Sequence, residues 1–196
     1  MADLSAFVLA GGRSSRMGSD KAFIELEGRT LLARALDLLR AITPEVSLVG
    51  PADKFAAYGS VIEDVFAGCG PLAGIHAALS ASMTELNLML AVDLPFVPQS
   101  LLRFIVEQAR ASDMLVTVPR IAGGFQPLCA VYRRGFAPLA ETALKAGNNK
   151  IDALFASTTV RILEEPELGR FAFSACMFEN LNTLEDLRRA MPKRSL

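Results

Sequence analysis

Glycines and basic residues that could hold an anion are concentrated near the start of the chain, directly after a short apolar stretch. The stretch covers residues 7–9 (FVL), and the glycines and cations that follow it are Gly11, Gly12, Gly18, Arg13, Arg16 and Lys21. A short apolar run bounded by glycine is typical of a buried strand. Glycine lets backbone N–H groups approach a phosphate closely, and the basic side chains add positive charge. The pattern predicts a phosphate-binding loop at the end of a strand; the alternative is a glycine-rich turn with solvated charges.

The spacing of the glycines excludes two common phosphate loops. A Walker A loop has four residues between its glycines and then Gly-Lys-Ser/Thr. Here five residues separate Gly12 from Gly18, and two more separate Gly18 from Lys21. The dinucleotide fingerprint G-x-G-x-x-G is absent because Gly11 and Gly12 are adjacent. The loop therefore belongs to another class of nucleotide site.

A carboxylate ends the strongest apolar run of the chain. Asp93 follows residues 86–92, which are apolar apart from Asn87, and Pro95 comes shortly after it. A lone carboxylate at the end of a buried strand is costly without a partner. Mg²⁺ is a suitable partner, because proteins hold it with one or two carboxylates plus substrate phosphates. The sequence favours Asp93 as a metal ligand over the alternative, a helix cap ahead of Pro98.

Composition restricts the class of protein. The chain has 196 residues, of which 52% are hydrophobic and 21% charged, which suits one folded domain over residues 1–196. A net charge of −1 gives no reason to expect nucleic acid or a membrane as partner. The longest apolar run is broken by Asp93 and Pro95, and we expect neither a membrane span nor a signal peptide. Three widely spaced cysteines without a C-x-x-C pair predict free thiols in a reducing cytoplasm.

The apolar spacing also predicts the elements that must position these residues. Helices are expected over residues 30–42, from about 74 to 82, 98–111, 135–146 and 151–155, with a last helix starting at the capping-box residue Thr183. Strands are expected over residues 46–49, 61–62, 86–92, 114–118, 126–132, 159–163 and 173–178. Strands and helices alternate through the first half, which is typical of a mainly parallel sheet with helices on both faces. The less regular second half predicts a mixed sheet.

Polar residues follow several of these strands at the point where each strand ends. The loop of residues 11–21 follows the first strand, Asp64 follows residues 61–62, and Asn180 and Asn182 follow the last expected strand. Ligands of open α/β sheets bind beyond the carboxyl ends of the strands. We therefore expect these residues and Asp93 at one edge of the sheet.

The loop carries a family resemblance. Residues 9–21 (LAGGRSSRMGSDK) closely resemble the L-A-G-G-x-S-x-R-M-G-x-D-K signature of the MobA-like nucleotidyltransferases. Residues 92–96 (VDLPF) resemble the family's C-D-x-P-F motif, whose Asp binds Mg²⁺ and nucleotide. Residues 61–64 (VIED) and 70–74 (GPLAG) are similar to a block whose Asp contacts the guanine nucleotide. The resemblance implies nucleotide binding by Leu9, Ala10, Gly11, Gly12, Lys21, Asp64 and Asp93, and catalytic roles for Arg16, Lys21 and Asp93.

Guanine recognition by Asp64 has a chemical basis. A carboxylate can accept two hydrogen bonds from the N1–H and 2-amino groups of guanine, and cytosine offers no such pair. The alternative is a loop aspartate that caps the following helix.

The second half resembles the family on its acceptor side. Residues 126–132 (QPLCAVY) resemble x-P-L-x-A-V-Y, and residues 178–186 (FENLNTLED) resemble F-x-N-x-N-T-P-E-D. In the latter motif the asparagines sit near the metal and the pterin, which implies acceptor binding by Asn180 and Asn182. Asn182 could instead be a helix N-cap. Residues 147–150 (GNNK) depart from the family's basic stretch and leave Lys150 as the one cation there.

The resemblance implies a three-layer Rossmann-like fold of the nucleotide-diphospho-sugar transferase type, with nucleotide binding in the N-terminal half and acceptor binding in the C-terminal half. It implies transfer of GMP from GTP to molybdenum-molybdopterin with Mg²⁺, and molybdoenzyme maturation proteins as partners. The alternatives are a cytidylyltransferase on the same pterin, a sugar- or polyol-phosphate nucleotidyltransferase, and a non-catalytic nucleotide-binding protein. Relatives specific for CTP more often read L-A-A-G at residues 9–12, so LAGG and Asp64 favour guanine.

Overall fold

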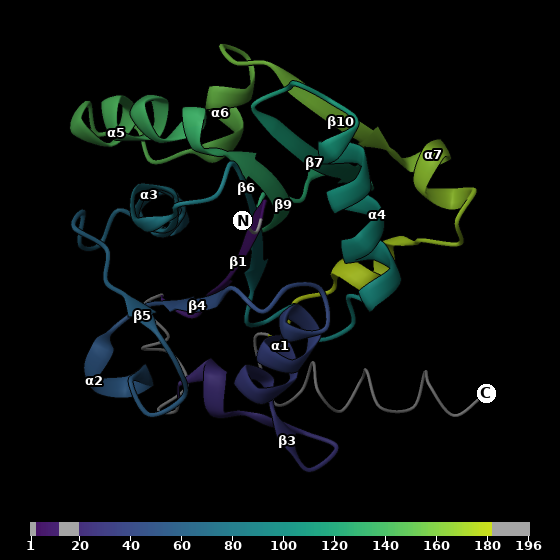
Figure 1. Ribbon diagram of the computed structural model, residues 1–196. Helices are drawn as coiled ribbons and strands as arrows, with labels where there is room; N and C mark the ends of the chain where they lie inside the picture. The colour runs from purple at the N-terminus through teal and green to yellow at the C-terminus, as the bar shows by residue number, and fades with distance from the viewer. Residues whose placement is uncertain (1–2, 12–19, 182–196) are drawn as a thin grey trace.

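A mixed sheet forms the centre of the protein in the computed structural model, which describes residues 3–11 and 20–181 (Figure 1). Its strands are β1 (Leu4–Leu9), β4 (Val46–Val49), β5 (Val61–Ile62), β6 (Leu86–Ala91), β7 (Val116–Ile121), β8 (Gly124–Phe125), β9 (Cys129–Arg133) and β10 (Val160–Glu164). They lie in the order β10-β7-β9-β6-β1-β4-β5, with β8 paired to β7. Among the described strands of this sheet, β9 and β8 are the ones that run antiparallel to their neighbours. The expected mostly parallel, mixed sheet is confirmed.

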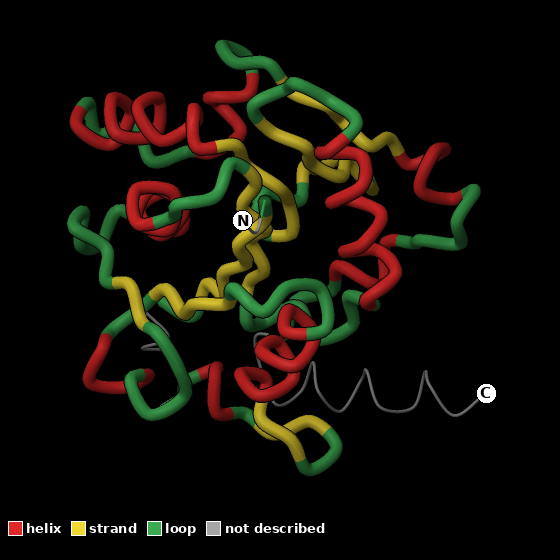
Figure 2. The backbone as a smooth tube through the Cα atoms, in the orientation of Figure 1, coloured by secondary structure: helices red, strands yellow, loops and turns green. Residues whose placement is uncertain are grey.

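Helices cover both faces of this sheet. They are α1 (Leu31–Arg40), α2 (Ala52–Phe55), α3 (Pro71–Ala81), α4 (Gln99–Arg110), α5 (Ala137–Lys145), α6 (Ile151–Phe155) and α7 (Glu165–Gly169). Figures 1 and 2 show the strands as a band with α1 and α4 on one side and α3, α5 and α6 on the other. Alternate residues of β1 face the two sides: Ala6 and Val8 pack in the core with α1 and α4, and Phe7 and Leu9 pack in the core with α3 and α5. The three-layer arrangement is confirmed.

Local sequence explains how two of the helices begin. The Thr30 hydroxyl accepts a hydrogen bond from the Ala33 amide at 3.1 Å and caps α1, as its type and position predict. Gly70 has φ +74°, a conformation that glycine adopts without strain, and Pro71 then begins α3. A Cβ at Gly74 would lie 3.4 Å from Val49 Cγ1, so this glycine lets α3 pack close against the sheet.

The strand expected over residues 173–178 is wrong. The chain there contains a short 3₁₀ helix, η3 (Ala175–Phe178). Phe173 and Phe178 are both buried in the same core, and the Phe173 ring lies 5.7 Å from that of Phe104 on α4. Residues five apart on a strand point to opposite faces, so a strand could not bury both rings on one side. The compact 3₁₀ turn buries both rings on one side of the sheet.

Two further boundaries differ from expectation or fall outside the described residues. The strand expected from residue 126 begins at Cys129, because Gln126 and Cys129 form a turn in which the Cys129 amide donates to the Gln126 carbonyl at 3.0 Å. The helix expected from Thr183 lies outside the described residues.

A short hairpin of β2 (Glu25–Leu26) and β3 (Arg29–Thr30) leads into α1. No helix in the described part of the chain has the length and apolar character needed to cross a bilayer.

Candidate functional site

The last residues of four parallel strands lie side by side at one edge of the sheet. Leu9 of β1 pairs in register with Val49 of β4 and Ala91 of β6, and Val49 pairs with Ile62 of β5. Gly11, Asp64 and Asp93 are each two positions beyond the end of their strand. The structure therefore brings three of the predicted site positions to one edge, in the spatial order β6, β1, β4, β5.

Lys21 and Asp93 meet at this edge although 72 residues separate them. The Lys21 ammonium donates to Asp93 Oδ2 at 3.3 Å, and the two side chains keep 27% and 20% of their surface exposed. Lys21 begins the short 3₁₀ helix η1 (Lys21–Phe23), and Asp93 follows β6. The pair combines a fixed positive charge with a half-buried carboxylate that stays accessible, which is what a site for a phosphate and a metal ion requires.

Asp64 lies at the far side of the same edge. Its carboxylate makes no hydrogen bond or ion pair with the described part of the chain, and it is half-buried beyond β5. Partial burial raises the pKa of Asp64, because removal from water disfavours the charged form. A ligand that donates hydrogen bonds to this carboxylate would offset that cost.

Two glycines form the floor between Asp93 and Asp64. A Cβ at Gly11 would lie 3.6 Å from the Cα of Gly50, so the backbones after β1 and β4 are neighbours here. The amides of Ala10 and Gly11 both donate to the Val49 carbonyl at 3.0 Å. The Gly11 amide thus attaches the start of the loop to the end of β4. Gly12 and Arg16 lie outside the described residues.

The chain returns to the site near its end. The Leu181 amide donates to the Asp93 carbonyl at 3.0 Å, which places exposed Asn180 next to the loop after β6. On the other side of β6 the Ala91 amide donates to the Leu128 carbonyl at 2.8 Å, so residues 126–128 also lie at this edge. Asn182 is outside the described residues. Both stretches with a resemblance to acceptor motifs therefore reach the Asp93 side of the edge, away from Asp64.

Known proteins are similar to this chain in sequence and in architecture. Residues 6–162 match the MobA-like NTP transferase domain. The chain belongs to the MobA-like NTP transferase family. A probable molybdenum cofactor guanylyltransferase of Pelotomaculum thermopropionicum is 35% identical, covering 97% of this chain and 93% of the relative. A second, from Carboxydothermus hydrogenoformans, is 34% identical over 100% of this chain and 99% of the relative. The crystal structure of molybdopterin-guanine dinucleotide biosynthesis protein A from Archaeoglobus fulgidus has a TM-score of 0.85 and 27% identity, covering 97% and 98% of the two chains.

The sequence did not reveal a pair of contacts beside Lys21. Asp20, the residue before Lys21 in the signature, accepts from the Ala22 amide at 3.3 Å through Oδ1 and from the Lys54 ammonium at 2.8 Å through Oδ2. The hydrogen bond to Asp20 raises the pKa of Lys54. A helix-capping residue type directly before η1 was the available signal for the first contact. Nothing in the sequence pairs residues 20 and 54.

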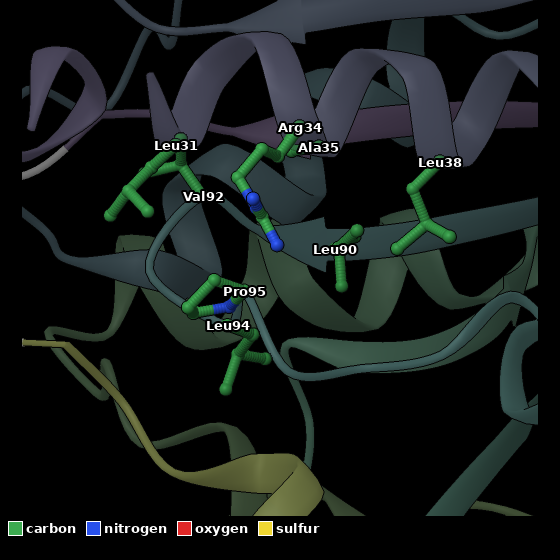
Figure 3. Close-up of a pocket in the computed structure, with 8 residues that line it drawn as sticks. All are labelled: Leu31, Arg34, Ala35, Leu38, Leu90, Val92, Leu94 and Pro95. Atoms are coloured by element: carbon green, nitrogen blue, oxygen red, sulfur yellow. The ribbon is translucent and has the colours of Figure 1, made fainter. Parts of the chain in front are cut away.

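A small cavity lies beside the site, on the α1 side of the sheet (Figure 3). Its volume is about 20 Å³, and its walls are formed by Leu31, Arg34, Ala35, Leu38, Leu90, Val92, Leu94 and Pro95. That volume suits about one water molecule. Because its walls are almost entirely apolar and it contains none of the site residues, we interpret it as a packing gap beneath the loop that carries Asp93.

Proposed function

We propose that this protein transfers GMP from GTP to molybdenum-molybdopterin and releases pyrophosphate. A phosphate oxygen of the acceptor forms a bond to the α-phosphorus of GTP, and the bond from that phosphorus to the bridging oxygen of the β-phosphate breaks. The observation that carries the proposal is the meeting of Lys21 and Asp93 at 3.3 Å, at the edge of the sheet that also holds Asp64, a carboxylate with no partner among the described residues. The names of the relatives support the choice of substrates.

The size of the edge suits one nucleotide. Asp93 and Asp64 follow strands that are three positions apart in the sheet, which is roughly 14 Å at a spacing of about 4.8 Å per strand. A nucleoside triphosphate has a comparable distance between its base and its phosphates. We place guanine at Asp64, which accepts from N1–H and the 2-amino group, and the triphosphate at Lys21 and Asp93. Leu9, Ala10 and Gly11 then line the path between them, and we assign nucleotide binding to Gly12 as well.

The donor set fits a magnesium ion held jointly with the substrate. Among the described residues no group of three or more His, Cys, Asp or Glu could enclose a metal. One carboxylate, Asp93, is consistent with Mg²⁺, which commonly keeps waters and takes phosphate oxygens as its other ligands. When bound, the ion would supply charge neutralisation at the phosphates.

The residues of the chain then position and neutralise the reacting groups. Lys21 and Arg16 counter the charge that develops on the departing pyrophosphate, and catalysis rests on positioning and electrostatics without a covalent enzyme intermediate. Asn180 binds the acceptor on the side of Asp93 that faces away from Asp64, and we assign acceptor binding to Asn182 as well. In this arrangement the N-terminal half binds the nucleotide and the C-terminal half binds the acceptor. We propose a cytoplasmic reaction whose product passes to molybdoenzyme maturation proteins.

Calorimetric titration with GTP, CTP, ATP and UTP, each with and without Mg²⁺, tests the nucleotide. We expect tight, Mg²⁺-dependent binding of GTP alone. Preference for CTP or UTP would contradict the role of Asp64 and direct the search to cytidylyl or sugar-phosphate chemistry. Pyrophosphate release with the loaded pterin acceptor then tests transfer, and binding of GTP without release would indicate a nucleotide-binding protein that does not catalyse.

A further inference from the structure

Both ends of the loop between β1 and η1 are attached to one segment, residues 49–55, which we call the anchor segment. At the entry, the amides of Ala10 and Gly11 both donate to the Val49 carbonyl at 3.0 Å. At the exit, the Lys54 ammonium donates to Asp20 Oδ2 at 2.8 Å. The separation of the two ends is therefore set by a part of the chain that lies outside the loop.

At the exit of the loop, residues before and after Lys21 in the sequence both contact α2. Before it, Asp20 is held by Lys54 and accepts from the Ala22 amide. After it, the Phe23 ring lies 5.9 Å from the ring of Phe55, which is adjacent to Lys54 on α2. A polar and an aromatic contact thus tie the turn that carries Lys21 to one face of α2.

The anchor segment is itself well fixed to the sheet. Phe55 is fully buried, and a Cβ at Gly50 would lie only 2.9 Å from its Cε2 atom, so α2 packs directly on the end of β4. The amide of Ala52, the first residue of α2, donates to Glu63 Oε1 at 2.9 Å, which ties α2 to the chain after β5. A segment fixed in this way can hold Asp20 in a defined position.

We propose that Lys54 is a positioning residue for catalysis, which acts through Asp20 to hold the Lys21 ammonium at Asp93. This inference rests on the proposed function, because it gives Lys21 a role in nucleotidyl transfer. Lys54 keeps 48% of its side chain exposed, so its ion pair adds little to stability. We expect Lys54 to affect the rate of transfer more than the stability, since displacement of a catalytic group by about 1 Å can lower the rate as much as a hundredfold.

The test compares Lys54→Met, which removes the charge, with Lys54→Arg, which keeps it. We expect kcat of GMP transfer to fall about tenfold in Lys54→Met, with KM for GTP changed less than about threefold, and to recover in Lys54→Arg. Lys145→Met is the matched control, because Lys145 forms an exposed ion pair with Glu141 at 2.7 Å elsewhere on the surface. Both Met variants should show the same small change in Tm, and Lys145→Met should keep the wild-type kcat.

Asp20→Asn separates action through Asp20 from direct contact with the nucleotide. Asparagine keeps an oxygen for the Ala22 amide but loses the charge that holds Lys54. If Lys54 acts through Asp20, Lys54→Met lowers kcat no further in the Asp20→Asn background. A full tenfold additional loss in the double variant would overturn the inference, as would wild-type kcat in Lys54→Met.

Amide hydrogen exchange without nucleotide provides a readout that is independent of turnover. The amides of Ala22, Phe23 and Ile24 donate to Asp20 and Lys21 within this turn. They should exchange faster in Lys54→Met and at the wild-type rate in Lys145→Met. Unchanged exchange in Lys54→Met refutes the positioning role whatever the enzyme does. A wild-type protein that transfers no GMP refutes the proposed function alone, if the exchange result holds.

Discussion

Replacement of Asp64 by alanine should remove the discrimination between GTP and ITP. Inosine keeps the N1–H of guanine and lacks the 2-amino group. A hydrogen bond to a charged group contributes about 1.5–3 kcal/mol, so the wild type should bind ITP roughly 10- to 150-fold more weakly than GTP. Because the Asp64 carboxylate makes no hydrogen bond with the described residues, it is available to accept both bonds. Asp64→Ala should bind the two nucleotides within about threefold of each other.

Competitive titration of GTP and ITP against wild type, Asp64→Ala and Asp152→Ala measures the ratio of the two affinities in each protein. Asp152 is the matched control, because partial burial raises the pKa of its carboxyl as it does that of Asp64, while it lies in the C-terminal half. Asp152→Ala should keep the wild-type ratio of affinities. A ratio that survives in Asp64→Ala would refute the reasoning, since it would mean that another group reads the 2-amino position.

The pH dependence of binding follows from the same carboxylate. Only ionised Asp64 accepts two hydrogen bonds, so GTP affinity should fall as the pH drops through its pKa. Because burial raises that pKa in the free protein, the loss should begin at a higher pH than for an ordinary aspartate. The sign for folding is opposite: ionised Asp64 costs stability above its folded-state pKa, so Asp64→Asn should unfold at a slightly higher Tm at neutral pH. That advantage should vanish in acid below the ordinary aspartate pKa.

Three further outcomes are expected. Lys21→Ala and Asp93→Ala should each lower kcat by about 10²- to 10³-fold with a folded circular dichroism spectrum, and full activity in either would exclude that residue from the chemistry. Burial raises the pKa of the Cys129 thiol to about 12, so mass spectrometry after maleimide treatment at pH 8 should find exposed Cys176 labelled and Cys129 unlabelled in the native protein. Val92→Ile should fill part of the cavity beside the site and raise Tm by about 1–3 °C, while a lower Tm would show that the space is too narrow for the added methyl group.

Local patterns determined the elements where one physical requirement dominated. The apolar run of β6 had to be a buried strand, and the threonine before α1 had to cap a helix, because both depend on neighbours in sequence. Residues 173–178 also suggested a strand, but Phe173 and Phe178 are buried in one core and the Phe173 ring packs against Phe104 on α4, a contact that sequence spacing does not reveal.

The sequence by itself determined the loop chemistry, the alternating strands and helices, and the residues that follow strand ends. Parallel register then required Gly11, Asp64 and Asp93 to share an edge, so that prediction needed topology but no side-chain detail. Only the tertiary structure decided that Lys21 reaches Asp93, that Asp64 lacks a partner among the described residues, and that Lys54 holds Asp20. Contacts between residues tens of positions apart depend on how helices and loops pack over the sheet, and that packing is a property of the whole chain.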